Sequence, residues 1–187
     1  MGFTPPYVTK LGKLAIGVLD SSSANDTKAK DVAEFSKDLK AISADAGSAG
    51  WLLSHKPIFG VAEKSGKMET LNATLEAAWK DAAPKNLPLL INGHTHLFEI
   101  LSFKDGPPIQ AVIGDSGTRL AKPLDSSQLP GFDIAGRTVA SANSFDSFAY
   151  GLMTPAGDGW RLRMRSKKGN NKVDCQLTPS TGAVACK

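Results

Sequence analysis

Three histidines in two short segments are the residues of this sequence best suited to metal chemistry. His94 and His96 stand two residues apart in Gly-His-Thr-His, and His55 stands in Ser-His-Lys-Pro. Neutral imidazole is the commonest nitrogen ligand of metal ions in proteins. The chain has only these 3 histidines, so it places all of them in the two segments. The pattern predicts a metal site made of His55, His94 and His96, and the open alternative is that they are structural or surface histidines.

Other polar residues stand beside these histidines. Asn92 and Gly93 immediately precede His94 and offer amide and backbone groups that could line the site. Asp20 ends an apolar run and could accept a hydrogen bond from an imidazole and so orient it. It is also followed by three serines, as a turn-forming aspartate often is, and both interpretations of Asp20 stay open.

Three apolar runs would position these residues. They cover residues 13–19, 51–54 and 88–91, and they end at Asp20, His55 and His94 or just before them. Runs that are apolar on both faces favour buried parallel strands. In such a sheet the ligand site lies beyond the carboxyl ends of the strands.

Helical periodicity separates the runs. Apolar residues at helical spacing predict a helix over residues 27–46, with Asp26 as its N-cap and Gly47 as its terminator. A second helix is predicted from a similar stripe that Pro84 ends. The stripe consists of Met68, Leu71, Leu75, Ala78 and Trp79.

The second half of the chain has the texture of antiparallel hairpins. Residues 97–103 and 109–113 flank a Lys-Asp-Gly-Pro-Pro turn, and residues 148–153 and 160–164 flank Pro-Ala-Gly-Asp-Gly. Residues 115–144 are polar and predict a long loop, in which we interpret Asp115 as a turn residue. The predicted fold class is therefore α/β (α+β), a mixed sheet with a parallel βαβαβ start followed by antiparallel hairpins.

Charge is unevenly distributed. The net charge is +4, and residues 101–187 hold 11 Lys and Arg against 7 acids. Much of the excess lies between Arg161 and Lys172, where arginines alternate with apolar residues as on one face of a strand. No aromatic residues interleave with these charges to stack bases, so we do not expect nucleic acid as a partner. No apolar run approaches the roughly 18 residues of a spanning helix, so we expect no membrane partner.

Cys175 and Cys186 are the only cysteines, and they flank a Pro-Ser-Thr-Gly turn. A hairpin disulfide between them would favour a periplasmic or secreted location, because disulfides persist in oxidising compartments. Two unpaired thiols would favour the cytoplasm, and both alternatives stay open.

Three segments together resemble the carboxyl-terminal half of the calcineurin-like metallophosphoesterases, the superfamily that includes purple acid phosphatases. They are Leu-Ser-His-Lys-Pro at 53–57, Ile-Asn-Gly-His-Thr-His at 91–96 and Val-Ile-Gly-Asp-Ser-Gly at 112–117. The resemblance covers roughly residues 7–120. It implies a sandwich of two sheets with helices outside, of which residues 1–187 would be the carboxyl-terminal portion of one domain. Within it, residues 1–114 would form an αβ part and residues 145–187 antiparallel strands with a hairpin.

The resemblance also implies ligand roles. His55 and His94 resemble two ligands of one metal, and His96 resembles a ligand of its neighbour. The family pairs two metal ions, Fe, Zn or Mn, and binds them with five sequence blocks. The first three blocks, Asp-x-His, Gly-Asp-x-x-Asp and Gly-Asn-His-Asp/Glu, do not occur in these 187 residues. They would supply the bridging carboxylate, which a pair of cations needs.

The functional expectation is a phosphoesterase that hydrolyses a phosphate ester with a metal-activated water. This chain would carry the last two blocks, and a missing amino-terminal half or a second copy would be its partner. One alternative is a truncated and inactive fragment or binding remnant of such an enzyme. A basic nucleic-acid-binding module ranks behind both.

Overall fold

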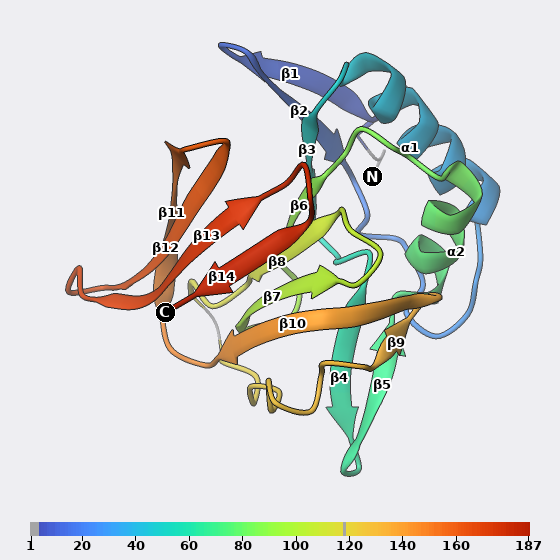
Figure 1. The fold of residues 1–187 in the computed structure, drawn as a ribbon. Coiled ribbons are helices and arrows are strands. Elements are labelled where there is room, and N and C mark those ends of the chain that lie inside the picture. The colour runs from blue at the N-terminus through green and yellow to red at the C-terminus, as the bar shows by residue number, and fades with distance from the viewer. Residues whose placement is uncertain (1–3, 118) are drawn as a thin grey trace. The chain divides into compact units, whose positions relative to one another are not determined.

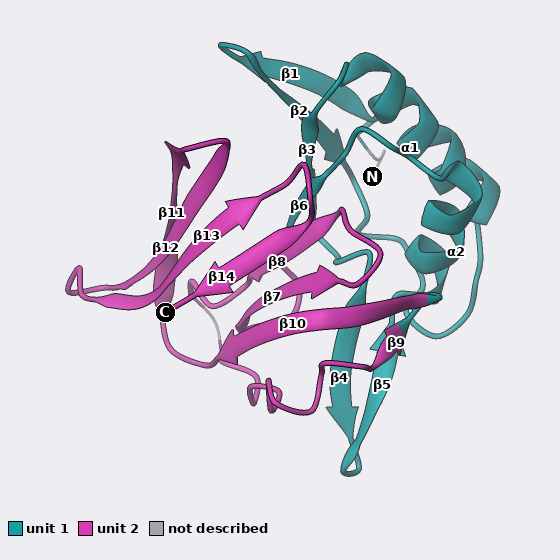
Figure 2. Cartoon of the chain, in the orientation of Figure 1, with its two compact units in different colours: residues 1–92, 134–136 teal, residues 93–133, 137–187 magenta. Residues whose placement is uncertain are grey.

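The computed structural model describes residues 4–117 and 119–187, which divide into two compact units. Unit 1 runs to Asn92 and includes residues 134–136, and unit 2 holds residues 93–133 and 137–187 (Figures 1 and 2). The division falls between Asn92 and Gly93. His55 therefore belongs to unit 1, whereas His94 and His96 belong to unit 2.

Unit 1 contains four neighbouring strands of a mixed sheet, in the order β1-β2-β3-β6. Antiparallel β1 and β2 form a hairpin, and β2, β3 and β6 run parallel, as the apolar runs predicted. The strands are β1 (Tyr7–Leu11), β2 (Leu14–Leu19), β3 (Gly50–Ser54) and β6 (Leu89–Asn92).

Two helices complete the crossovers between the parallel strands, α1 (Val32–Asp45) and α2 (Ala73–Ala82). Phe35, Leu39 and Ile42 of α1 are buried. Gly17 of β2 lets the helix come close, because a Cβ there would lie 2.2 Å from Cγ2 of Ile42. The prediction that α1 begins after an Asp26 N-cap is wrong, since the helix begins only at Val32 and the Asp26 carboxylate pairs with a lysine instead.

The start of the second predicted helix is also wrong. Met68 and Leu71 lie in β5 (Lys67–Leu71), which pairs antiparallel with β4 (Gly60–Lys64). Ser65 and Gly66 between these strands both have positive φ, at 53° and 78°. This is the backbone of a tight two-residue hairpin turn, so the chain reverses where the apolar spacing alone suggested a helix.

Unit 2 consists of antiparallel strands in two sheets. The first holds β8, β7 and β10 side by side, and the second has the order β11-β12-β13-β14. The strands are β7 (Phe98–Phe103), β8 (Ile109–Ile113), β10 (Arg137–Phe145), β11 (Ala149–Ala156), β12 (Gly159–Ser166), β13 (Asn171–Thr178) and β14 (Ala183–Cys186). A two-residue strand, β9 (Asp133–Ile134), crosses the unit boundary.

The two sheets of unit 2 face each other. A Cβ on Gly151 of β11 would meet the Ile113 side chain of β8 at 3.0 Å, and Leu162 and Met164 of β12 are buried. The predicted fold class, α/β with a parallel start and antiparallel hairpins, is confirmed.

Residues 115–144 are only partly a loop. The nine residues of β10 pair with β7, and the Phe145 ring stacks on Phe98 with centroids 4.8 Å apart. The segment looks polar because hydroxyl groups pair across the strands, as between Ser141 and Ser102 (2.7 Å). The expectation of a long loop is therefore wrong from Arg137 onward.

Of the two alternatives left open for the cysteines, the structure has the hairpin disulfide, because Cys175 of β13 and Cys186 of β14 stand directly opposite each other. The arginines of β12 lie on the face of the strand that is opposite to its buried residues, as the alternation predicted. Among the described residues, no helix is long and apolar enough to cross a membrane.

Candidate functional site

The carboxyl ends of the three parallel strands of unit 1 lie at one level. Leu19 of β2 pairs with Ser54 of β3, and Ser54 pairs with Asn92 of β6. The residues that follow directly are Asp20, His55 and Gly93. The parallel ladder thus ends at one edge with the polar residues that the sequence marked for chemistry, as ligand sites of open α/β sheets do.

The backbone just after His55 is fixed by three hydrogen bonds that involve side chains. The Lys56 N–H donates to Oγ of Ser21 (2.8 Å), and the Ser54 hydroxyl donates to the Lys56 carbonyl (2.8 Å). The amide of buried Asn72 donates to the Pro57 carbonyl (2.8 Å). Because β2, β3 and the start of α2 all contribute, the chain direction at His55 is set by several elements at once.

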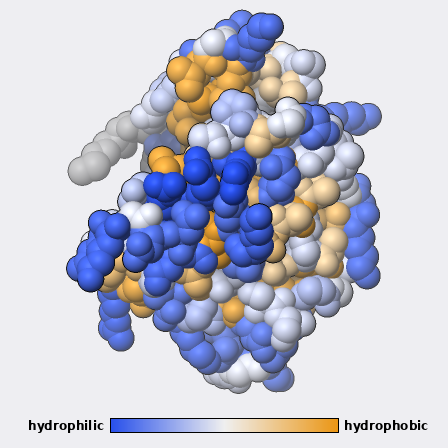
Figure 3. Space-filling view, turned by 60° about the vertical axis from the view of Figure 1, so that its left-hand side comes forward, coloured by the Kyte–Doolittle hydropathy of each residue, from blue (hydrophilic) through white to orange (hydrophobic). Residues whose placement is uncertain are grey.

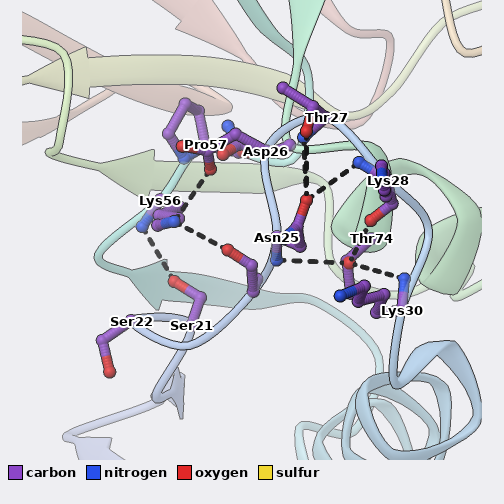
Figure 4. A network of polar contacts seen from close by, with 12 residues as sticks. Ser21, Ser22, Asn25, Asp26, Thr27, Lys28, Lys30, Lys56, Pro57 and Thr74 are labelled. Carbon is purple, nitrogen blue, oxygen red and sulfur yellow. Dashed lines mark hydrogen bonds and ion pairs between the residues drawn. The ribbon is translucent and has the colours of Figure 1, made fainter.

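Lys56 extends this network through its side chain (Figure 4). Its Nζ donates to the Ala24 carbonyl (2.7 Å) and to Oδ1 of Asp26 (2.8 Å). The Lys56 side chain is only 11% exposed, so its charge is compensated by this carboxylate. No sequence pattern indicates a role for Lys56, because a lysine next to a proline carries no signal of burial.

Asn25 and Thr74 fix the other end of the same loop. The Asn25 side chain accepts hydrogen bonds from the backbone of Thr27 (3.1 Å) and Lys28 (2.9 Å). The Thr74 hydroxyl of α2 accepts from the N–H groups of Asn25 (3.2 Å) and Lys30 (3.1 Å) (Figure 4). The loop after β2 is therefore held against α2 rather than left to solvent.

Asn92 presents a buried amide oxygen at the end of β6. Its Nδ2 donates to Oγ of Ser54 (2.7 Å), which in turn donates its only proton to the Lys56 carbonyl. Ser54 can therefore only accept from Asn92, which fixes the orientation of the amide. The Asn92 Oδ1 is buried and has no hydrogen-bond partner among the described residues.

Asp20 forms a turn with Ser22. Its Oδ1 accepts from the Ser22 hydroxyl (2.6 Å) and the Ser22 N–H (3.1 Å). These hydrogen bonds lower the pKa of Asp20, and the nearby His55 adds a smaller contribution of the same sign. The turn-forming role is thus present, and the attraction to His55 shows that the carboxylate also lies within electrostatic range of the imidazole.

The Gly-His-Thr-His segment of unit 2 is a very tight turn. The Thr95 N–H donates to the Gly93 carbonyl (2.9 Å), and the Leu97 N–H donates to the Thr95 carbonyl (2.8 Å). His94 has a φ of 70°, a left-handed conformation that costs energy in a residue with a Cβ. Such strain persists where the surrounding structure holds it.

Gly114 provides part of that hold. A Cβ on Gly114 would lie 1.9 Å from the Thr95 carbonyl oxygen, so only glycine fits here. The Gly114 N–H donates to the Leu97 carbonyl (3.0 Å). The segment after β8 therefore packs backbone to backbone against the turn that carries both histidines.

The imidazole of His96 is oriented by a backbone carbonyl. Its Nδ1 lies 3.0 Å from the Arg119 carbonyl oxygen. A carbonyl can only accept, so Nδ1 carries a proton, and in the neutral imidazole the lone pair is then on Nε2. Metal-binding histidines are typically oriented in this way.

Asp115, which the sequence favours as a turn residue over a ligand, is buried in the structure. It follows Gly114, is fully buried, and neither carboxylate oxygen has a hydrogen-bond partner among the described residues. Burial raises the pKa of Asp115 to about 6. No feature of the sequence indicates this burial, because Gly-Asp-Ser-Gly is typical of an exposed turn.

The donor set suits a metal ion only in part. His96 offers a lone pair at Nε2, and Asn92 offers an amide oxygen without a partner. Among the residues that the structure describes, no group of three or more His, Cys, Asp or Glu side chains is arranged to hold a metal ion. The candidate ligands form one set in unit 1, with His55, and one in unit 2, with His94 and His96.

Comparison with known proteins identifies the fold. No family model matches the sequence, and no curated protein matches it. Among solved structures, PhoD matches with a TM-score of 0.64 at 10% identity, over 99% of this chain and 44% of that one. The purple acid phosphatase PPD1 from yellow lupin (Lupinus luteus) seeds matches with a TM-score of 0.53 at 15% identity, over 89% and 31%.

A third structure is GAP50, the anchor in the inner membrane complex of Plasmodium. It matches with a TM-score of 0.51 at 15% identity, over 90% of this chain and 51% of that one. This chain thus spans between about a third and a half of the length of each of the three structures. At these identities the likeness concerns the fold, and the chain has a metallophosphoesterase-like fold.

Proposed function

We propose that this chain is part of a metal-dependent phosphoesterase in which His55, His94 and His96 are metal ligands. The observation that carries the proposal is the imidazole of His96, whose Nδ1 donates to the Arg119 carbonyl, which leaves Nε2 as the nitrogen that can bind a metal. The strained backbone of His94 and the network around His55 support it. The fold likeness to a purple acid phosphatase and PhoD supports phosphate esters as the substrate class.

The histidines alone suit one ion rather than two. Three neutral imidazoles bring no negative charge, and a pair of cations needs a bridging carboxylate. When bound, Zn, Mn or Fe would polarise a phosphate ester and lower the pKa of a coordinated water. The proposal therefore includes further acidic ligands from polypeptide outside these 187 residues, and little hydrolysis by the isolated chain.

The experiment is a titration of the purified chain with Co²⁺, followed by its visible absorption, with Zn²⁺ as competitor. We expect one ion per chain and at least a tenfold loss of affinity in His94→Ala and in His96→Ala. Asp158→Asn, in an exposed turn between β11 and β12, is the control and should bind as the parent does. Equal binding by the parent and the His94→Ala/His96→Ala double variant would refute the metal site.

Hydrolysis is measured on the same proteins with a chromogenic phosphate monoester and diester. The expected result is weak or absent turnover with Mn²⁺ or Zn²⁺. Efficient turnover that is lost in His94→Ala would show that the chain is self-sufficient and would overturn the requirement for outside ligands.

A second function, an inactive binding remnant of such an enzyme, has one observation in its favour. The three blocks that would supply the carboxylate ligands and the proton donor do not occur in the sequence. The Co²⁺ titration separates the two functions, because a remnant need not keep an intact ligand set and its affinity would not respond to His96→Ala.

A further inference from the structure

The second sheet of unit 2 has a cationic outer face. Strand residues alternate between the two faces of a sheet, so the buried Leu162 and Met164 of β12 place Arg161, Arg163 and Arg165 on the opposite side. We call that side the outer face. Figure 3 looks toward the side on which β11, β12 and β13 lie in Figure 1, and strongly hydrophilic residues gather there beside hydrophobic ones.

Exposed apolar side chains come from the neighbouring strand. Tyr150 pairs with Arg165, and Leu152 pairs with Arg163. Tyr150 is 44% exposed, and Phe148, which directly precedes β11, is 51% exposed. Along the chain, no aromatic residues alternate with these charges, and this is why nucleic acid was not expected as a partner. In the sheet, strand pairing places Tyr150 of β11 beside Arg165.

The charges on this face differ in their availability. Arg161 is bound by Asp174 through Nε (2.7 Å) and Nη2 (2.5 Å). Arg163 and Arg165 have no ion pair among the described residues, and both bury Nε without a hydrogen-bond partner. Arg163 stands opposite Asp174 in β13 and is attracted to its carboxylate, so Arg165, next to Tyr150, is the guanidinium group most available to an anion.

A hollow at the end of the same sheet adds three lysines. It has a volume of about 340 Å³ beside the turn between β12 and β13. Its lining includes Phe148, Lys167, Lys168, Asn170, Asn171 and Lys172. All three lysines are exposed, and none has an ion pair within the described part of the chain.

We infer that this face and hollow bind single-stranded nucleic acid. The lysines suit phosphates, the rings of Phe148 and Tyr150 suit stacked bases, and the amides of Asn170 and Asn171 can pair with base edges. Aromatic rings and cations continue from the hollow to Tyr150 and Arg165, which favours a strand over a single nucleotide. The headgroups of an anionic membrane could bind the same cations, but they offer no base edges for the neighbouring side-chain amides of Asn170 and Asn171.

The first test measures the binding of a fluorescently labelled 12-mer of deoxythymidylate by anisotropy at several salt concentrations. Four phosphate contacts predict that log affinity falls with log salt with a slope of about −3. Lys167→Gln/Lys168→Gln should flatten that slope by about 1.4 and weaken binding roughly 50-fold at 50 mM salt. The control is Lys10→Gln/Lys13→Gln, an exposed pair at the β1–β2 turn, which removes the same charge and should change neither value.

The second test concerns stacking. Phe148→Ala should weaken binding about tenfold, and Phe148→Trp should preserve it, because any aromatic face can stack on a base. A duplex of the same length should bind more weakly than the single strand, since its bases are already stacked. Phe148 is half exposed, so all variants should keep the parent circular dichroism spectrum.

Several results would overturn the inference. Equal loss of affinity in Lys167→Gln/Lys168→Gln and in the control Lys10→Gln/Lys13→Gln would mean unspecific electrostatic attraction. Equal affinity for the single strand and the duplex would exclude stacking. If thymidine monophosphate displaced the labelled 12-mer as effectively as the unlabelled 12-mer does at the same nucleotide concentration, the hollow would be a site for free nucleotides. Binding to phosphatidylserine vesicles without binding to the 12-mer would make it a membrane contact. None of these readouts depends on the histidines, so this inference and the proposed function can fail separately.

Discussion

The two units fix their histidines by different physical means. In unit 1 side chains do this, because Ser21, Ser54 and Asn72 form hydrogen bonds with the backbone of the two residues that follow His55. In unit 2 the backbone does it, because a turn closed by its own N–H groups packs against Gly114. A side-chain network can lose one member and keep the rest, whereas backbone packing tolerates no added atom.

The units also differ in how they treat buried acids and bases. The buried ammonium of Lys56 in unit 1 has a carboxylate and a carbonyl as partners. In unit 2, Asp115 and one oxygen of Glu99 are buried without hydrogen-bond partners among the described residues. Unsatisfied buried groups cost stability, so neutralising Glu99 in unit 2 should stabilise the protein, whereas neutralising Lys56 in unit 1 should destabilise it.

The largest effect is expected from Gly114→Ala. The added methyl group would meet the Thr95 carbonyl oxygen at 1.9 Å, which forces the backbone apart. We expect a loss of at least about 3 kcal/mol in the free energy of unfolding, measured by urea denaturation. Gly117→Ala is the control, because nothing lies within 4 Å of its Cβ position. If both variants were equally stable, backbone packing would not hold the turn.

Glu99→Gln should stabilise the protein in alkaline solution. Burial raises the pKa of Glu99 from 4.5 to about 8, so the folded state keeps a proton that the unfolded state has released. The stability that this proton brings is complete below pH 4.5 and is lost as pH rises to 8. At pH 8 the variant should exceed the parent by roughly 2–3 kcal/mol in free energy of unfolding.

The same unfolding series at pH 4.5 and pH 8 provides the check for Glu99. Glu69→Gln, at an exposed position, should show no such dependence on pH. A parent protein whose stability does not change between these pH values would contradict a buried neutral acid.

Lys56→Met should cost about 2 kcal/mol in free energy of unfolding, since it leaves the Ala24 carbonyl and the Asp26 carboxylate without their donor. Lys64→Met is the matched control, because that side chain is 74% exposed against 11% for Lys56. The variant should also bind Co²⁺ more weakly through His55. Unchanged affinity with reduced stability would show that the network supports the fold and not the histidine.

The smallest effect is expected from Ser22→Ala. Loss of the Ser22 hydroxyl should raise the pKa of Asp20 toward its ordinary value, as followed by NMR titration of the carboxyl group. A lowered carboxyl pKa stabilises the fold above the ordinary pKa, and this contribution is lost as pH falls through the folded pKa. The variant should thus be less stable near neutral pH, by under about 1 kcal/mol, and equal at very low pH. Ser23→Ala should leave the pKa of Asp20 unchanged.

The sequence predicted those helices and strands in which the apolar residues follow a single spacing. The parallel strands, the hairpins of the second half and the disulfide follow from apolar runs and turn residues. The hairpin of β4 and β5 was missed because the spacing of Met68, Leu71 and Leu75 fits a helix, although Ser65-Gly66 is itself a turn signal. The strand β10 was missed because its pairing with β7 depends on residues some 40 positions away.

The site was predictable only in its ligand types. The histidines stand out by their number and spacing, but the burial of Lys56 and Asp115 depends on tertiary packing that no local pattern records. The close packing of the histidine turn against Gly114 likewise joins residues some twenty positions apart in the chain. Likewise, Tyr150 and Arg165 become neighbours only through strand pairing.

The level alignment of Leu19, Ser54 and Asn92 has a consequence for protein engineering. The height of His55 is set by ladder hydrogen bonds, so lengthening the exposed connection between α1 and β3 should leave it in place. Deleting one residue inside β3 would instead draw His55 back by about 3.3 Å and send its side chain to the opposite side of the sheet. The length of this connection is therefore free to vary, whereas the length of β3 is not.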